Sequence, residues 1–214
     1  CTTMQSTINA DYQSNIIIED NYFESRYWGY YAENSTGNHI LRNNEFVKLN
    51  EDWTGNGNWF VYATNMDNIF IEDNVFRSEQ GAGGDGGIYI ENTGAEINRN
   101  LIHTSGIGIQ VYDQAGSMIS QNTIISNDNG EYGMHITQLS APSVYSNIIQ
   151  GFQNGIYADN DLSNTELRNN NLWLITENDF EGSAMPPLIG NYVSSNVNGD
   201  LSDIYGNISM DPIF

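Results

Sequence analysis

Positive charge is scarce in this sequence of 214 residues. Only 6 residues are Lys or Arg, against 27 Asp or Glu, which gives a formal net charge of −21. A chain this acidic repels the phosphates of DNA and RNA, so nucleic acid is excluded as a partner. The excess of negative charge suggests that the protein binds divalent cations, works in a saline medium or needs the charge to stay soluble.

Cysteine and long apolar runs are lacking too. Cys1 is the only cysteine, so no disulfide can form within the chain. No apolar run reaches the roughly 18 residues that a membrane-spanning helix needs. A cysteine at position 1 fits a lipidated bacterial lipoprotein, but also an excision boundary or a small buried side chain. The sequence has neither an initiator Met nor a signal peptide, so we expect a chain that is either processed or an excerpt of a longer protein.

Asparagine is what the sequence has in excess, with 31 copies beside 21 Gly and only 4 Pro. Asparagine disfavours helices and favours turns. The octet IIIEDNYF at 16–23 returns as IFIEDNVF at 69–76. Both belong to a pattern [ILV]-x-x-N-x-[FIL] whose seven copies are spaced 22 to 30 residues apart. Their asparagines are Asn21, Asn44, Asn74, Asn100, Asn122, Asn147 and Asn170.

A second pattern lies between these copies and begins with glycine. It reads GIYIEN at 87–92, GIQVYD at 108–113 and GIYADN at 155–160, with NWFVYA at 58–63 as a looser copy. Each repeat therefore holds three short apolar runs that alternate by two, which is typical of strands and too short for helices. Three strands per repeat predict a single all-β domain, a right-handed parallel β-helix of about seven turns with three parallel sheets. We expect each recurring asparagine to occupy a tight bend in the left-handed conformation and to stack into a side-chain ladder.

These repeats resemble those of the right-handed parallel β-helix family, which includes pectate-lyase-like and polygalacturonase-like enzymes and many noncatalytic surface proteins. The resemblance implies the fold and leaves the activity open. We assign the repeats to residues 1–175 and an irregular segment that packs on the last turns to residues 176–214. The ending GNISMDPIF resembles the closing segment of secreted bacterial β-helix domains, in which the chain continues further. Ends without a cap invite self-association through exposed strand edges.

The resemblance also implies a cleft over the sheet of Gly-initiated strands, walled by the long loops 49–57, 78–86 and 126–131. Strand alternation then predicts two outward rows. The first is Tyr31, Phe60, Tyr89, Gln110, His135 and Tyr157. The second is Glu33, Tyr62, Glu91, Tyr112, Thr137 and Asp159. Aromatic rings with polar edges suit sugars, so we predict carbohydrate contact through Tyr31, Trp53, Tyr62, Tyr89, Tyr112, His135 and Tyr157. The competing interpretation is that these rings only stack on one another, and that Trp53 only packs as a lid.

The catalytic motifs of polygalacturonase-like enzymes do not occur in the sequence. A lyase needs a base and a cation for the uronate carboxylate, and Lys48 is the only lysine. Glu33 and Glu91 could instead form a glycosidase pair, two turns and about 9–10 Å apart. These three residues define the enzymatic alternative, a polysaccharide lyase or glycoside hydrolase.

Calcium is the cofactor that the loops favour. The stretch SNDNGE offers oxygen ligands from Asp128, Asn129 and Glu131. The three histidines lie on different repeats without the spacing of zinc ligands. We therefore expect an extracellular or surface-attached bacterial module without catalysis, structural in role, that contacts a polysaccharide or cell-surface glycan. A ligand-free spacer or fibre segment is the third alternative.

Overall fold

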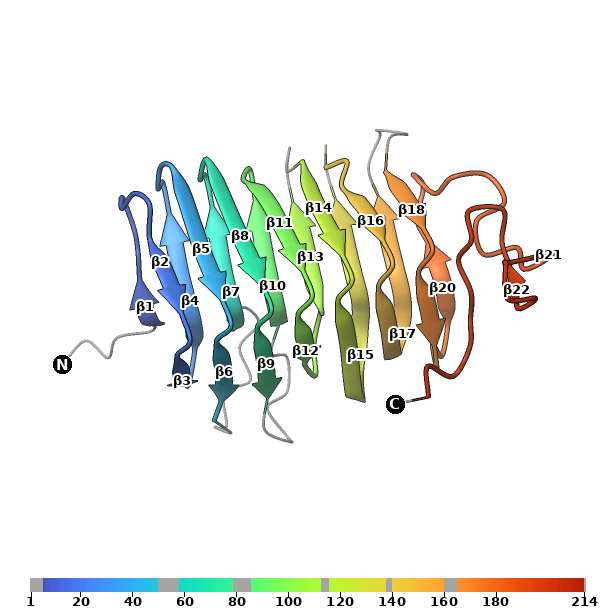
Figure 1. Ribbon diagram of the computed structural model, residues 1–214, viewed down its shortest axis with the longest axis horizontal. Coiled ribbons are helices and arrows are strands. Elements are labelled where there is room, and N and C mark those ends of the chain that lie inside the picture. The colour runs from blue at the N-terminus through green and yellow to red at the C-terminus, as the bar shows by residue number, and fades with distance from the viewer. Residues whose placement is uncertain are drawn as a thin grey trace.

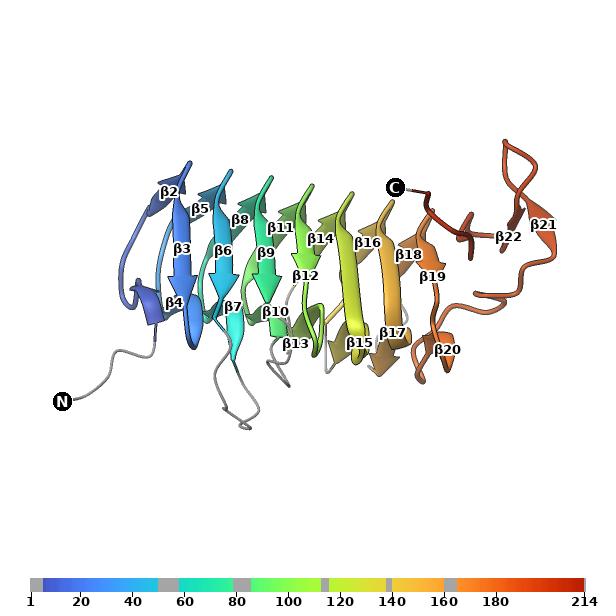
Figure 2. The same cartoon turned by 90° about the horizontal axis from the view of Figure 1, so that it is seen from below.

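The computed structural model describes residues 6–49, 58–78, 86–112, 116–137, 140–159 and 165–213. Its strands stack into a parallel β-solenoid (Figure 1), and the view from below shows successive turns following one another along the long axis (Figure 2). The described part of the chain holds no helix long and apolar enough to cross a membrane.

The strands that precede each asparagine form one parallel sheet of seven, here called the pre-Asn sheet. Its strands are β2 (Ile17–Glu19), β5 (Asn38–Arg42), β8 (Asn68–Glu72), β11 (Gly94–Asn98), β14 (Ser117–Ser120), β16 (Ser143–Tyr145) and β18 (Glu166–Arg168). Seven strands enclose about six complete turns, so the expected count of about seven is slightly high.

Two further faces complete the coil, and strands β15 (Thr123–Thr137) and β17 (Ile148–Asp159) run through both of them. The post-Asn sheet contains the first parts of β15 and β17 together with β3 (Tyr22–Ser25), β6 (Glu45–Lys48), β9 (Val75–Ser78), β12 (Leu101–His103) and β19 (Asn171–Trp173). The Gly-initiated sheet contains their later parts together with β1 (Ser6–Asn9), β4 (Trp28–Glu33), β7 (Trp59–Thr64), β10 (Gly86–Glu91), β13 (Ile109–Tyr112) and β20 (Asn178–Glu181).

Alternation along each strand separates the core from the surface. In β10, Ile88 and Ile90 are fully buried, whereas Tyr89 and Glu91 point outward. Each strand of the solenoid pairs in parallel with its counterpart one turn away, with one shift of register between β15 and β17, so equivalent positions stack along the long axis. The phenylalanines of the post-Asn sheet illustrate this, because the Phe23 and Phe46 rings lie 4.9 Å apart and Phe46 and Phe76 5.2 Å apart.

We expected the left-handed conformation at each ladder asparagine. It is found instead at the residue immediately before each one. These preceding residues have φ between 55° and 59°. They are Asp20, Asn43, Asp73, Arg99, Gln121, Ser146 and Asn169. The bend turns the following asparagine inward, where its side chain is buried from Asn44 to Asn170.

The asparagines form a ladder with a single direction. Each backbone N–H donates to the side-chain oxygen of the next asparagine at 2.9–3.1 Å, and the side-chain amide donates to the same oxygen. The amide also donates to a carbonyl one turn back, as Asn100 does to Ile71 at 2.8 Å. All the amide dipoles therefore point the same way along the solenoid.

The C-terminal segment supplies an eighth rung and ends the ladder. Asn170 donates to Asn207 at 2.9 and 3.1 Å. The two N–H groups of Asn207 in turn donate to the buried carboxylate of Asp203 at 2.9 and 3.0 Å, and this carboxylate also accepts the backbone N–H groups of Gly190 and Tyr205. Each rung donates toward the C-terminal end, so the last rung needs an acceptor. A carboxylate suits this place because it accepts hydrogen bonds and donates none. Strands β21 (Ser194–Ser195) and β22 (Leu201–Ser202) form a short antiparallel pair beyond it.

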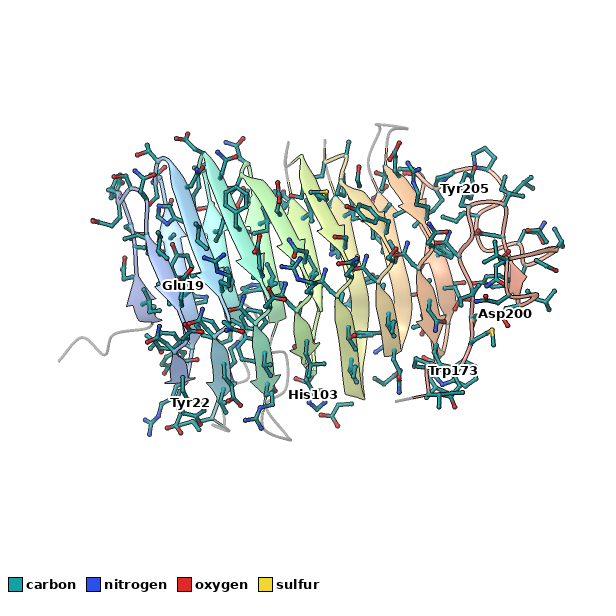
Figure 3. The ribbon with its side chains drawn as sticks, in the orientation of Figure 1. Glu19, Tyr22, His103, Trp173, Asp200 and Tyr205 are labelled. Carbon is teal, nitrogen blue, oxygen red and sulfur yellow. The ribbon has the colours of Figure 1, made fainter. Side chains whose placement is uncertain are left out.

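The other end of the solenoid is more open. Asn21, the first rung, is exposed, and Ile17 and Tyr22 are 62 % and 56 % exposed. Figure 3 shows Glu19 and Tyr22 on this first turn and Asp200 and Tyr205 in the segment at the opposite end. Within the described ranges the two ends therefore differ, since the C-terminal one carries a terminal acceptor for the ladder.

Candidate functional site

The outward face of the Gly-initiated sheet carries a continuous row of aromatic and polar side chains. The register aligns Tyr31, Tyr62, Tyr89, Gln110, His135 and Tyr157. The prediction was wrong at β7, where it placed Phe60 in this row. Phe60 occupies the corner position that glycine fills in other turns and is fully buried, so Tyr62 takes the place in the row.

A second row runs beside the first, two residues further along each strand. It aligns Glu33, Thr64, Glu91, Tyr112, Thr137 and Asp159. The buried Thr64, and not Tyr62 as predicted, therefore lies between Glu33 and Glu91. Two strand spacings separate these carboxylates, about 9–10 Å.

The tyrosine rings stack on one another. The centroids of Tyr31 and Tyr62 lie 5.2 Å apart at 3°, and those of Tyr62 and Tyr89 lie 4.8 Å apart at 6°. Tyr112 continues the stack at 6.5 Å from Tyr89. Both faces of the Tyr62 ring are thus covered by neighbouring rings, and the surface presents ring edges and hydroxyl groups.

Two tyrosine hydroxyls are held by carboxylates on the same strand. The Tyr31 hydroxyl donates to Glu33 at 2.9 Å, and the Tyr89 hydroxyl donates to Glu91 at 3.0 Å. Burial raises the pKa of Tyr62, and the negative charges of Glu91 and Glu33 raise it further. The tyrosines stay neutral, and their hydroxyls fix the orientation of the carboxylates.

Two tryptophans complete this face, and the two predicted rows did not include them. Trp28 lies 5.0 Å from Tyr31, and Trp59 lies 5.3 Å from Tyr89. Both occupy the same position of the Gly-initiated strand, three residues before a tyrosine of the first row. The sequence shows both tryptophans, in WGYYAE and in NWFVYA. Their equivalence could be recognised only once the register of the second copy was known.

A second aromatic group lies toward the C-terminal end of the same face. Tyr132 stacks on His135 at 4.7 Å, and Tyr157 lies 5.2 Å from both rings. The Nδ1 atom of His135 is buried without a hydrogen-bond partner. Burial lowers the pKa of His135, although the charges of Glu131 and Asp159 oppose this shift. The imidazole is therefore kept neutral between aromatic neighbours.

Positive charge is absent from the strands of this face. All six Lys and Arg residues fall within the described ranges, and none lies on a strand segment of the Gly-initiated sheet. Arg42, Arg99 and Arg168 pair with carboxylates at the pre-Asn sheet, and Arg77 pairs with Glu45 on the post-Asn sheet. Arg26 lies in the connection between β3 and β4.

Lys48, the candidate base of the enzymatic alternative, lies inside the molecule. It is 1 % exposed, and its ammonium group sits 4.8 Å from the centre of the Phe60 ring. The chain turns at this corner and carries the side chain inward, in register with Ser25 and Ser78. Lys48 therefore does not reach the outer face that carries Glu33 and Glu91.

The stretch predicted as a calcium loop is part of a strand. Asp128, Asn129 and Glu131 lie within β15, where pairing with β17 shifts register between Ile125 and Gly130. The Asn129 side-chain oxygen accepts a hydrogen bond from the Thr176 hydroxyl at 3.1 Å. Among the described residues there is no group of three or more His, Cys, Asp or Glu that could hold a metal.

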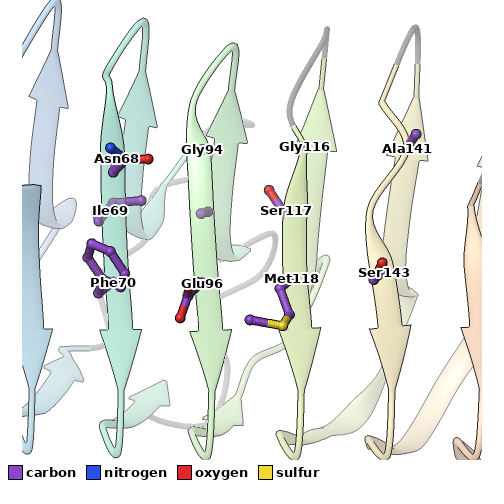
Figure 4. Close-up of a pocket in the computed structure, with 11 residues that line it drawn as sticks. Asn68, Ile69, Phe70, Gly94, Glu96, Gly116, Ser117, Met118, Ala141 and Ser143 are labelled. Atoms are coloured by element: carbon purple, nitrogen blue, oxygen red, sulfur yellow. The ribbon is translucent and has the colours of Figure 1, made fainter.

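A shallow groove of about 350 Å³ lies on the pre-Asn sheet (Figure 4). Gly94 and Gly116 form its floor because they carry no side chain, and Phe70, Glu96 and Met118 stand beside them. Among the described residues that line it, Glu96 is the one that is ionisable.

A family model described as right-handed beta helix region matches residues 52–199. The chain belongs to the right-handed β-helix family. This match covers most of the solenoid and confirms the predicted fold and its handedness; it carries no statement about activity. No curated protein and no solved structure matches this β-helix.

Part of the predicted site lies outside the described residues. This holds for Trp53, for most of the two loops 49–57 and 78–86, and for Cys1. The other predicted carbohydrate contacts are brought together on the outward face of the Gly-initiated sheet, in two groups. The first is Tyr31, Tyr62, Tyr89 and Tyr112, and the second is His135 with Tyr157.

Proposed function

We propose that this β-helix is a noncatalytic module at the bacterial cell surface or outside the cell, which contacts a polysaccharide along its Gly-initiated sheet. The observation that supports this proposal is the outward row of Tyr31, Tyr62 and Tyr89 with the carboxylates of Glu33 and Glu91 beside it. Carboxylates accept hydrogen bonds from sugar hydroxyls, and tyrosine edges offer apolar area with a polar tip.

Stacking within the tyrosine row limits how a sugar could contact these rings. A sugar cannot lie flat on Tyr62, because Tyr31 and Tyr89 occupy both faces of its ring. Contact would instead run across the ring edges and hydroxyls, with the stack as a rigid support. The rings lose little freedom on binding, because stacking already orders them.

Glycan-array binding followed by titration tests this proposal. Tyr62→Ala opens a gap in the row and should weaken binding to a positive glycan by about tenfold. Tyr22→Ala is the control, because Tyr22 is an outward tyrosine that donates to Glu24, as Tyr31 does to Glu33, but lies on the post-Asn sheet. An array without any hit would favour the ligand-free spacer.

An enzyme acting on a polysaccharide is the second candidate. The alignment of Glu33 and Glu91 in one column supports it, since their separation falls near the upper end of the range for inverting glycosidases. Incubation with pectins, alginates and neutral glycans should release no new ends if the module is noncatalytic. Turnover that is lost in Glu33→Gln or Glu91→Gln would establish the enzyme instead.

A further inference from the structure

The sign of the charge along the outward face limits which polymer fits it. The Gly-initiated sheet carries Glu33, Glu91, Glu131, Asp159 and Glu181 on its strands, and none of the six Lys or Arg residues lies there. Such a surface repels uronates and other anionic chains. It attracts a polymer that carries positive charge.

The hydrogen-bonding groups of the face point to the same chemistry. The hydroxyls of Tyr31 and Tyr89 already donate to Glu33 and Glu91, so both tyrosines keep only acceptor capacity for a ligand. Each carboxylate also retains an oxygen that accepts. A protonated amine brings three donors and no acceptor, whereas an acetamido group brings a carbonyl that needs a donor.

The spacing of the row favours a glycan over a peptide. Equivalent side chains repeat at the strand spacing of about 4.8 Å, which is close to the advance of one pyranose unit in an extended β-linked chain. An extended peptide places side chains on one face only every two residues, or about 6.6–6.8 Å. A basic peptide would therefore drift out of step with the row.

We propose that the ligand of the Gly-initiated sheet is a cationic, amino-sugar polymer whose protonated amines lie against the Glu33 and Glu91 carboxylates. This inference rests on the proposed carbohydrate contact and names its substrate class. The raised pKa of Tyr62, to which both carboxylates contribute after burial, agrees with a negative potential across the row.

Calorimetric titration with two hexamers of β-1,4-linked glucosamine, one fully deacetylated and one fully N-acetylated, tests the inference. The titrations are run at about pH 5.5, where amines are protonated and most carboxylates ionised. The deacetylated hexamer should bind at least about tenfold tighter, and raising NaCl from about 0.05 M to about 0.5 M should remove most of that advantage.

Isosteric variants assign the effect to the face. Glu33→Gln and Glu91→Gln should each weaken binding of the deacetylated hexamer by about fivefold or more. Glu24→Gln should not, although Glu24 also accepts from a tyrosine, because it lies on the post-Asn sheet. Unchanged unfolding midpoints in all three variants would show that folding is intact.

The remaining outcomes separate this inference from the proposed function. Equal binding of both hexamers, or binding of neutral glycans alone, would overturn the cationic ligand and leave the carbohydrate contact standing. Equal binding of a lysine hexamer would also overturn it, because charge alone would then suffice. If no glycan of any kind binds, both proposals fail.

Discussion

Asp203 is the residue that closes the ladder. It is 2 % exposed and accepts four hydrogen bonds from three residues. A single carboxylate thus satisfies donors from the last rung and from the C-terminal segment. By accepting from both groups, Asp203 holds residues 176–213 against the last turn of the solenoid.

Asp203→Asn should therefore destabilise the fold, because an amide turns one acceptor into a donor that faces another donor. We expect a loss of about 1–3 kcal/mol in the free energy of unfolding. Asp211→Asn is the control, since Asp211 is exposed and accepts a single hydrogen bond from the described residues, from Ile213 at 3.1 Å. Equal denaturation midpoints for the two variants would contradict the terminal role.

His39 makes stability depend on pH. It is fully buried, with its Nδ1 atom 2.5 Å from the Tyr30 hydroxyl, and burial lowers its pKa below the usual 6.5. The unfolded chain then binds a proton more readily than the folded one. Stability should be full above about pH 6.5 and fall as the pH drops below it.

Unfolding free energies measured from pH 7.5 to 5.5 check this expectation. His39→Gln should flatten the decline, because its side chain keeps an acceptor for Tyr30 without titrating. His135→Gln should flatten it separately, since burial lowers that pKa too. A wild-type protein whose stability rises on acidification over this range would contradict the assigned direction.

At the scale of the strand, close stacking of backbone leaves room only for glycine at most corners, although Phe60 fills this position in β7. A Cβ atom on Gly87 would lie 2.1 Å from the Gly108 carbonyl oxygen and 2.7 Å from Ile102. The chain of the next turn occupies that space and cannot withdraw without breaking the pairing of β10 with β13. The contact explains why the second repeat pattern begins with glycine.

Gly87→Ala should cost about 1–3 kcal/mol or more through this overpacking. Gly116→Ala is the matched control, because a Cβ atom there meets none of the described residues within 4 Å. Chemical denaturation of both variants measures the difference. If Gly116→Ala proved the more harmful, the stacking argument would be wrong.

The strands and their faces could be predicted from the sequence because period-two alternation and the Asn pattern recur in every turn. What failed was local register. Phe60 replaces a glycine, so NWFVYA was read two positions out of register and Tyr62 was put in the wrong row. The corner at 126–131 reads as a loop by composition, yet pairing with β17 draws it into a strand. The burial of Lys48 and the role of Asp203 depend on contacts that no sequence period marks.

At the scale of the whole molecule, the charge of −21 is unevenly placed. Five of the six cations lie outside the core, in the connection before β4 or paired with carboxylates at the pre-Asn and post-Asn sheets. The strands of the Gly-initiated sheet are left with carboxylates and no Lys or Arg. Repulsion along this face opposes folding, so ions that reduce it should stabilise the solenoid.

Calcium should accordingly raise the unfolding temperature. A cation that binds only the folded state stabilises it by mass action, and we expect a gain of several degrees in millimolar Ca²⁺ over a chelator (roughly 1 kcal/mol). Sodium chloride at matched ionic strength is the control for plain screening. Identical midpoints under the two conditions would leave calcium without a role.

The central claim is that the outward face of the Gly-initiated sheet is the surface that meets a glycan. An NMR titration of the uniformly labelled protein with the deacetylated glucosamine hexamer tests it most directly. The account predicts chemical-shift changes concentrated on β4, β7, β10 and β13, around Tyr31, Tyr62 and Tyr89. Changes concentrated instead around Phe70 and Met118 in the groove of the pre-Asn sheet, or no changes at all, would contradict it.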